Sequence, residues 1–296
     1  MLATAPPKAR SLVVTVWGDA IAPHGGAVWL SGLIRLLAPL GLNERLVRTS
    51  VYRLARDGWV VAQAQGRRSV YRLTAQGRRR FEDAYRRIYA SPQSAWGGKW
   101  EIIVAPQATL RPTERAELRK ELWWAGFGTL APGVFIRPAH AGGRETTARL
   151  RALGVASRVT LLAVEDDGGR TTRPLESWVP DCWNLDAIAS EYSAFIDRFA
   201  DVIQTFSRLE TLDPEQCFIV RTLLIHEFRR VTVHDPQLPR ALLPSRWPAS
   251  EAYALCRDFY RRTHKEAERH LARTVARDSG GLPPAAAYFF RRFGGL

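Results

Sequence analysis

The segment LNERLVRTSVYRLARDGWVVAQAQGRRSVYRL (residues 42–73) predicts a basic helix followed at once by a basic two-stranded hairpin. Asn43 is placed to cap a helix that ends near Asp57, because Asn side chains accept hydrogen bonds from the first free N–H groups of a helix. The strand-like segments Trp59–Gln63 and Ser69–Leu73 follow, joined by a glycine-containing turn. This order of elements is typical of a winged helix-turn-helix, a fold that binds DNA.

The two faces of this helix differ chemically. Apolar residues recur at helical spacing on one face, whereas Arg, Thr and Tyr occupy the other. Such polar side chains reach base edges and phosphates when a helix enters the major groove. In the helix, the predicted DNA contacts are Arg45, Arg48, Thr49, Tyr52, Arg53 and Arg56. In the wing and the helix after it, they are Arg67, Arg68, Arg78 and Arg79, with Arg80 beside them. For each single arginine the alternative is a solvated surface side chain.

The excess of positive charge is concentrated near the N-terminus. The chain has 296 residues and a formal net charge of +14, and residues 1–95 hold 15 basic and 5 acidic side chains. A basic segment of this kind indicates a polyanionic partner. Of the 43 basic residues 39 are Arg, which a GC-rich genome explains. Genome bias explains neither the excess over acidic residues nor its position in the chain.

The sequence shows no sign of a disulfide framework or of secretion. Cys182, Cys217 and Cys256 lie far apart and form no CxxC motif, so we expect reduced thiols. No apolar run approaches the roughly 18 residues of a membrane span. The segment Met1–Arg10 lacks the apolar core of a secretion signal. We therefore expect a cytoplasmic protein without membrane contact.

Three segments with different patterns predict an α+β multidomain protein. Residues 1–92 contain the winged helix-turn-helix, which begins with helices at Ser11–Ile21 and Ala27–Leu37. Residues 97–175 alternate strands and helices, which predicts a ferredoxin-like middle domain with one strand that cannot be placed. The predicted strands are Lys99–Ala105, Gly133–Arg137 and Arg158–Val164, and the predicted helices are Pro112–Ala125 and Arg144–Leu153. Residues 178–296 form a helical C-terminal domain, with helices at Ala187–Leu209, Asp213–Glu227 and Glu251–Arg273.

Three motifs carry a resemblance to a known family. They are TVWGDAIAPHGGAVWLSGLIRLLAPLGLNERLVRTSVYRLARDGWV (residues 15–60), KWEIIVA (99–105) and IHEFRRVTVHDPQLPRALLPSRWPA (225–249). The chain resembles the PaaX family of bacterial repressors, which control phenylacetate catabolism, over nearly its whole length. The resemblance implies a winged helix, a middle domain of ferredoxin-like type related to Cas2, and a helical C-terminal domain.

The resemblance also implies partners. It implies a homodimer on a palindromic operator of double-stranded DNA, contacted through the arginines named above. An aryl-acyl-CoA such as phenylacetyl-CoA would release the repressor, although relatives that sense other thioesters or aromatic acids leave the effector of this chain open. Apart from that small-molecule effector, we expect no cofactor.

The third motif is the candidate effector site. Cations suit the phosphates of a CoA thioester, and an apolar slot suits its acyl group. The candidate effector-binding residues are His226, Arg229, Arg230, His234 and Trp247. The alternative is that the arginines pair with neighbouring acids and that Trp247 packs in the core. Trp178 and Trp183 carry the same ambiguity.

Enzyme motifs are weak. His226 and Glu227 lack the second His of a zinc protease, because position 230 is Arg. A Cas2-like metal nuclease is a further alternative, but the strand at 99–105 offers only Glu101, near its start. We therefore expect no catalytic residues and no metal. The second hypothesis is an effector-independent interaction or RNA-binding protein that uses the same basic face.

Overall fold

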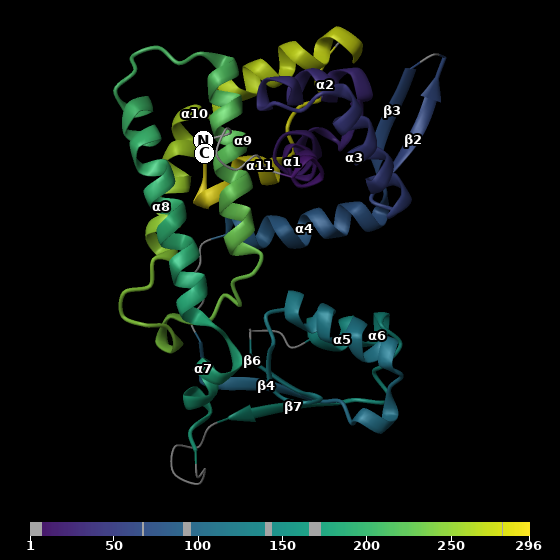
Figure 1. The fold of residues 1–296 in the computed structure, drawn as a ribbon, viewed down its shortest axis with the longest axis vertical. Coiled ribbons are helices and arrows are strands. Elements are labelled where there is room, and N and C mark those ends of the chain that lie inside the picture. The colour runs from purple at the N-terminus through teal and green to yellow at the C-terminus, as the bar shows by residue number, and fades with distance from the viewer. Residues whose placement is uncertain (1–7, 67, 91–95, 140–143, 166–172, 280) are drawn as a thin grey trace. The chain divides into compact units, whose positions relative to one another are not determined.

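The computed structural model describes residues 8–66, 68–90, 96–139, 144–165, 173–279 and 281–296 (Figure 1). The chain forms two compact units. The larger unit contains Met1–Ser91, Ala194–Arg230 and Glu251–Leu296, and the smaller unit contains Pro92–Ser193 and Val231–Ser250. The expected C-terminal segment 178–296 is thus shared between the units, because α8 (Leu185–Ser207) and α9 (Pro214–Thr232) each have residues in both.

The N-terminal part of the larger unit is a winged helix-turn-helix. Its helices are α1 (Ala9–Val16), α2 (Leu30–Leu37), α3 (Glu44–Arg56) and α4 (Ala75–Tyr89), with short turns at Trp17–Ile21, Ala22–His24 and Ala38–Leu40. Its strands are β1 (Ala27–Trp29), β2 (Val60–Gln65) and β3 (Arg68–Leu73). They form an antiparallel sheet in the order β1-β3-β2, so β2 and β3 make the wing. The predicted helix over 43–57 and the hairpin after it are confirmed as elements of the fold.

One strand of this sheet was not predicted. The helical spacing of apolar residues predicts a helix from Ala27 to Leu37, whereas β1 takes the first three of these residues. Val28 pairs with Tyr71 of β3 and is 2% exposed. A β-branched residue followed by Trp suits a strand, and β3 has an edge to pair with, so pairing outweighs the helical pattern here.

Aromatic side chains hold the helical part of the larger unit together. The remaining helices are α10 (Ala249–Ser279) and α11 (Ala287–Phe290), with a last turn at Arg292–Gly294. The ring of Phe195 on α8 lies 5.4 Å from that of Phe228 on α9, and Phe206 on α8 lies 5.3 Å from Phe259 on α10. Pairs at these distances stabilise a core beyond their buried area alone.

The smaller unit contains the predicted ferredoxin-like domain. Its elements are β4 (Lys99–Val104), α5 (Pro112–Trp124), β5 (Gly128–Ala131), β6 (Val134–Pro138), α6 (Arg144–Ala152) and β7 (Thr160–Glu165), with a turn at Gln107–Thr109. The antiparallel sheet has the order β5-β6-β4-β7. The strand that the sequence could not place is β5, which is four residues long and pairs irregularly with β6. So short a strand carries too few residues to show an alternating pattern.

Both faces of this sheet are covered. Figure 1 shows α5 and α6 on one side, where Ile103, Leu122 and Phe135 belong to a buried cluster. On the other side Trp100 and Ile136 pack with Val179 of α7 (Val179–Cys182) and with Leu238. Short turns at Leu175–Trp178 and Arg240–Leu242 complete the unit. The segment that follows α9 is therefore part of the core of the smaller unit.

The wing arginine Arg67 lies outside the described residues. The three cysteines are free thiols. Among the described helices, none is both long and apolar enough to cross a membrane.

Candidate nucleic-acid interface

The ends and the buried face of α3 fix the orientation of its outer face. The Asn43 side chain accepts a hydrogen bond from the Leu46 N–H at 2.9 Å, which is the predicted N-cap. At the other end Gly58 adopts a positive φ of 73°, a conformation that glycine takes without strain. Val47 and Val51 are fully buried. The polar residues at helical spacing from them must therefore face solvent.

All six predicted contacts of α3 are exposed. Tyr52 is 67% exposed, and the arginines and Thr49 around it are exposed as well. Arg48 pairs with Glu44 at 2.7 Å, and Arg56 lies 3.4 Å from Asp57. Such solvated pairs contribute little, so a phosphate can replace the carboxylate. Arg45 and Arg53 form no ion pair within the described part of the chain.

The wing is a second exposed basic element. Residues 61–66 of β2 and the turn are all exposed, and Gly66 has a φ of 62°. Arg68 is exposed and lies 3.8 Å from the carboxylate of Asp278 on α10, which also pairs with Arg35. Arg72, which was not predicted, is exposed on β3 and donates to the Gln63 side chain at 2.8 Å across the hairpin. Arg72 lies two residues after the buried Val70, on the same face of β3, so strand alternation in the sequence did not single it out.

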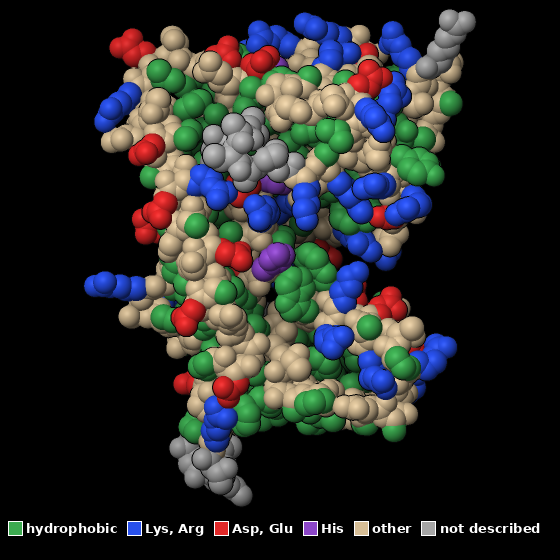
Figure 2. All heavy atoms as spheres, viewed as in Figure 1, with side chains coloured by type: hydrophobic (Ala, Val, Ile, Leu, Met, Phe, Trp, Pro, Cys, Tyr) green, Lys and Arg blue, Asp and Glu red, His purple; other side chains and the backbone are tan. Residues whose placement is uncertain are grey.

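The start of α4 completes the basic surface. The Thr74 hydroxyl accepts from the Gly77 N–H at 2.9 Å, so the predicted cap is present. Arg78 and Arg79 are exposed and form no ion pair within the described residues, whereas the Arg80 guanidinium lies 5.1 Å from the centre of the Trp59 ring. In Figure 2 many Lys and Arg side chains gather over the elements of the winged helix.

The five candidate effector residues do not share one environment. In the larger unit, His226 is buried, with its Nδ1 3.0 Å from the Thr15 hydroxyl of α1. Burial, with Arg229 and Arg230 nearby, lowers the pKa of His226 to about 4. Arg229 donates to the Ser11 hydroxyl at 2.8 Å. These two side chains fasten α9 to α1, and the exposed Arg230 pairs with Glu227 at 3.1 Å.

The other two candidates belong to the smaller unit. Trp247 is buried, with its ring 6.2 Å from that of Tyr192, as the packing alternative predicted. His234 is exposed, and its ring lies 5.2 Å from that of Trp123. Of the five, His234 alone borders the cavity of the smaller unit.

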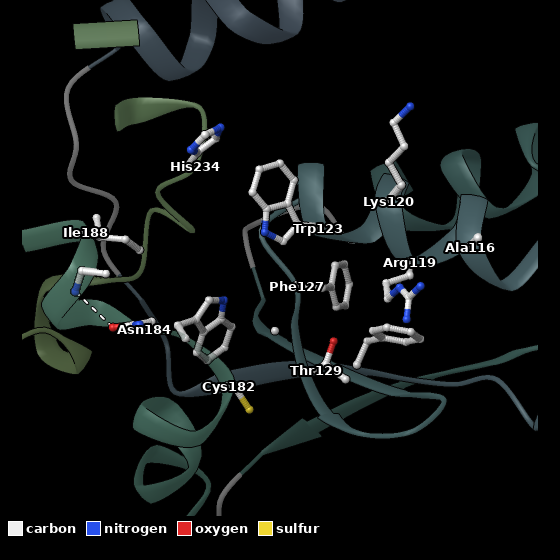
Figure 3. A pocket seen from close by; sticks show the side chains of 14 residues that line it. Ala116, Arg119, Lys120, Trp123, Phe127, Thr129, Cys182, Asn184, Ile188 and His234 are labelled. Carbon is white, nitrogen blue, oxygen red and sulfur yellow. Dashed lines mark hydrogen bonds between the residues drawn. The ribbon is translucent and has the colours of Figure 1, made fainter. Parts of the chain in front are cut away.

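This cavity has a volume of about 680 Å³ and lies within the smaller unit (Figure 3). Residues from α5, β5, β6 and the segment 182–188 line it, together with His234. Three of its lining residues, Arg119, Lys120 and Trp123, lie on one face of α5. Sequence reasoning missed them, although their spacing of three and four residues on a helix was the available signal.

Glu101, the carboxylate that a metal nuclease would need, is bound by other side chains of the core. Glu101 is 4% exposed and accepts from Arg137 Nε at 2.8 Å and from the Thr146 hydroxyl at 2.8 Å. Among the described residues, no group of three or more His, Cys, Asp or Glu side chains is arranged to hold a metal. The geometry of Glu101 is that of a buried ion pair in the core.

Comparison with known proteins covers nearly the whole chain. The family model described as PaaX-like protein matches residues 8–77, the PaaX protein central Cas2-like domain matches 93–175, and the PaaX-like protein C-terminal domain matches 183–273. The transcriptional repressor PaaX of Escherichia coli (strain K12) is 35% identical over 292 residues, which are 98% of this chain and 92% of that protein. By its name, that relative is a transcriptional repressor.

A solved structure has a similar fold. The uncharacterized protein Rv0674 from Mycobacterium tuberculosis superposes with a TM-score of 0.53 at 25% sequence identity, covering 89% of this chain and 98% of that one. The mixed α+β architecture, with a Cas2-like central domain and a helical C-terminal part, agrees with the prediction. The three matched models and the full-length relative together show that the chain belongs to the PaaX-like protein family.

Proposed function

We propose that this protein is a transcriptional repressor of an aromatic-acid catabolic operon of the phenylacetate type, acting in the cytoplasm on double-stranded DNA. The similarity to the transcriptional repressor of Escherichia coli supports repression. The observation that carries DNA binding is the outer face of α3, where Arg45 and Arg53 have no ion pair among the described residues and flank the exposed Tyr52. Cations without acidic partners are free to neutralise phosphates or to reach guanine edges.

Different elements of the winged helix would contact different parts of the DNA. Helix α3 enters the major groove, and its Arg, Thr and Tyr side chains contact bases. Arg68 of the wing and Arg78 and Arg79 of α4 contact phosphates on either side. In a homodimer two such helices would read the two halves of a palindromic operator, one helical turn or a multiple apart.

An effector would then release the repressor from its DNA. An aryl-acyl-CoA such as phenylacetyl-CoA binds the form of the dimer that does not fit the operator. Because a ligand shifts an equilibrium only through different affinities for the two states, the effector must bind free repressor more tightly than DNA-bound repressor.

A mobility-shift assay on the DNA upstream of the gene for this protein tests the proposal. The double variant Arg45→Ala/Arg53→Ala is expected to lose about 2 kcal/mol of binding free energy or more, roughly thirtyfold in affinity. The control is Arg151→Ala/Arg208→Ala, which removes the same charge from exposed positions outside the winged helix. Equal loss in both doubles would show non-specific electrostatics only, and unchanged binding of the first would refute the assignment.

A further inference from the structure

The cavity of the smaller unit has the size and walls of a small-molecule site. Its volume of about 680 Å³ falls within the range of ligand pockets, about 300–1,000 Å³. Four aromatic rings line it: Trp123 of α5, Phe135 of β6, Phe127 between α5 and β5, and Trp183, which precedes α8. Figure 3 shows Trp123 and Phe127 on the same side of the cavity.

One aromatic side chain of the cavity, Phe127, is buried and packs against a guanidinium. Phe127 is 3% exposed, and the guanidinium of Arg137 lies 4.7 Å from the centre of its ring. Arg137 is in turn held by Glu101 at 2.8 Å. A ring fixed in this way offers a flat apolar surface without loss of side-chain entropy on binding.

The position of Trp183 in the cavity wall depends on the absence of a side chain at Gly128. A Cβ on Gly128 of β5 would lie 2.8 Å from Cε2 of the Trp183 ring and 2.6 Å from Cβ of Cys182. No side chain fits between these groups, so Gly128 lets the indole lie directly against the strand. The wall therefore takes its position from the fold before any ligand arrives.

Two cationic side chains also line the cavity. Arg119 and Lys120 are exposed on α5 and form no ion pair with any described residue. None of the described residues that line the cavity is Asp or Glu. Aromatic walls and two unpaired cations suit a ligand with a flat apolar end and an anionic end.

The thiol in the wall does not make this a catalytic site. Burial, with Asp181 nearby, raises the pKa of Cys182 to about 11. The thiol is therefore protonated at neutral pH, and the thiolate that attacks a thioester is nearly absent. A thioester would be bound there and not cleaved.

We propose that this cavity, and not the cluster around His226, is the effector site, and that it takes an elongated anion with an aromatic or branched apolar end. The inference rests on the proposed function, since it gives that function's effector a place. The apolar end lies between Trp123, Phe127 and Trp183, and the anionic end meets Arg119 and Lys120.

The chain connects this cavity to the unit that carries the winged helix. Asn184 in its wall caps α8, accepting from the Ala187 N–H at 3.1 Å, and α8 continues into the larger unit from Ala194. His234 follows the end of α9 by two residues, and nearly all of α9 belongs to the larger unit. A ligand that moves these two segments acts directly on helices whose other parts pack in the larger unit.

Calorimetric titration of the full-length protein with phenylacetyl-CoA, CoA and phenylacetate tests the site. Trp123→Ala is expected to weaken phenylacetyl-CoA binding at least tenfold. The neighbouring Trp124→Ala is the control, because Trp124 is exposed on the same helix but does not line the cavity. Arg119→Glu/Lys120→Glu should likewise weaken binding at least tenfold, whereas Arg151→Glu should not.

The results with phenylacetyl-CoA, CoA and phenylacetate distinguish whether the site, the ligand or the repressor function is wrong. If phenylacetate binds tightly on its own and Trp123→Ala loses this binding, the result supports the site and identifies the free acid as its ligand. Binding of CoA as tight as that of the thioester overturns it, because the aromatic walls would then contribute nothing. If phenylacetyl-CoA releases wild type and Trp123→Ala from DNA at equal concentration, the site is wrong while the repressor function stands. If no probe binds protein that still binds its operator, the inference fails and DNA binding survives.

Discussion

The carboxylate of Asp19 lies 3.2 Å from the Arg221 guanidinium, and neither side chain is more than 2% exposed. Asp19 follows α1 of the winged helix, and Arg221 belongs to α9. The same carboxylate accepts from the Tyr89 and Tyr260 hydroxyls at 2.6 and 2.9 Å and pairs with the buried Arg292 at 3.1 Å. Asp19 thus pairs with two buried arginines, of which Arg221 also pairs with Glu268 at 2.9 Å, and it joins the winged helix to the helices of the larger unit.

Replacing Asp19 should therefore destabilise the larger unit strongly. In Asp19→Asn two buried guanidiniums lose a charge partner, and such a loss costs about 3–5 kcal/mol. Urea unfolding at pH 7 measures it. Asp258→Asn, which removes an exposed surface pair with Arg257, is expected to change stability by less than about 1 kcal/mol. A loss for Asp19→Asn as small as for Asp258→Asn would show that water reaches the cluster.

Local patterns predicted the helix and the hairpin of the winged helix well. The cap at Asn43, the spacing along α3 and the hairpin turn all involve residues within a few positions of one another. The Asp19 cluster could not be predicted in this way, because its partners lie 70, 202, 241 and 273 residues away in the chain. The candidate effector residues were grouped by their proximity in sequence, which does not show the unit to which each belongs. His226 and His234 are eight residues apart but belong to different units, since the chain passes from one unit to the other after Arg230.

Gly77 should not tolerate a side chain. A Cβ there would lie 2.0 Å from the Trp59 carbonyl oxygen, so α4 must move away from the wing. Gly77→Ala is expected to cost about 1–3 kcal/mol despite the better helix propensity of Ala. It should also weaken DNA binding, because Arg78 and Arg79 move with α4. Gly97→Ala, where no atom lies within 4 Å of the added Cβ, should behave as wild type in thermal unfolding and mobility shifts.

Arginines that bind phosphates and arginines that contact bases should differ in how their replacement changes the salt dependence of DNA binding. Arg78→Ala/Arg79→Ala is expected to reduce the slope of log K against log salt by about 2, near 1 for each phosphate that is no longer neutralised. Its preference for operator over unrelated DNA should stay unchanged. Arg45→Ala/Arg53→Ala should lower that preference. Fluorescence anisotropy at a series of salt concentrations distinguishes the pairs, and an unchanged slope for the first would place α4 away from the DNA backbone.

His226 should make the protein sensitive to acid. Its pKa is lowered to about 4 in the folded state, mainly by burial, against about 6.5 in an unfolded chain. The unfolded state then binds a proton more readily, so stability is full above pH 6.5 and is lost as the pH falls toward 4. The loss over this window is on the order of 3 kcal/mol. In His226→Gln the side chain still reaches Thr15 but cannot titrate. Chemical unfolding of both proteins at pH 7, 6 and 5 should show a steeper decline for wild type, and parallel declines would mean that His226 stays solvated.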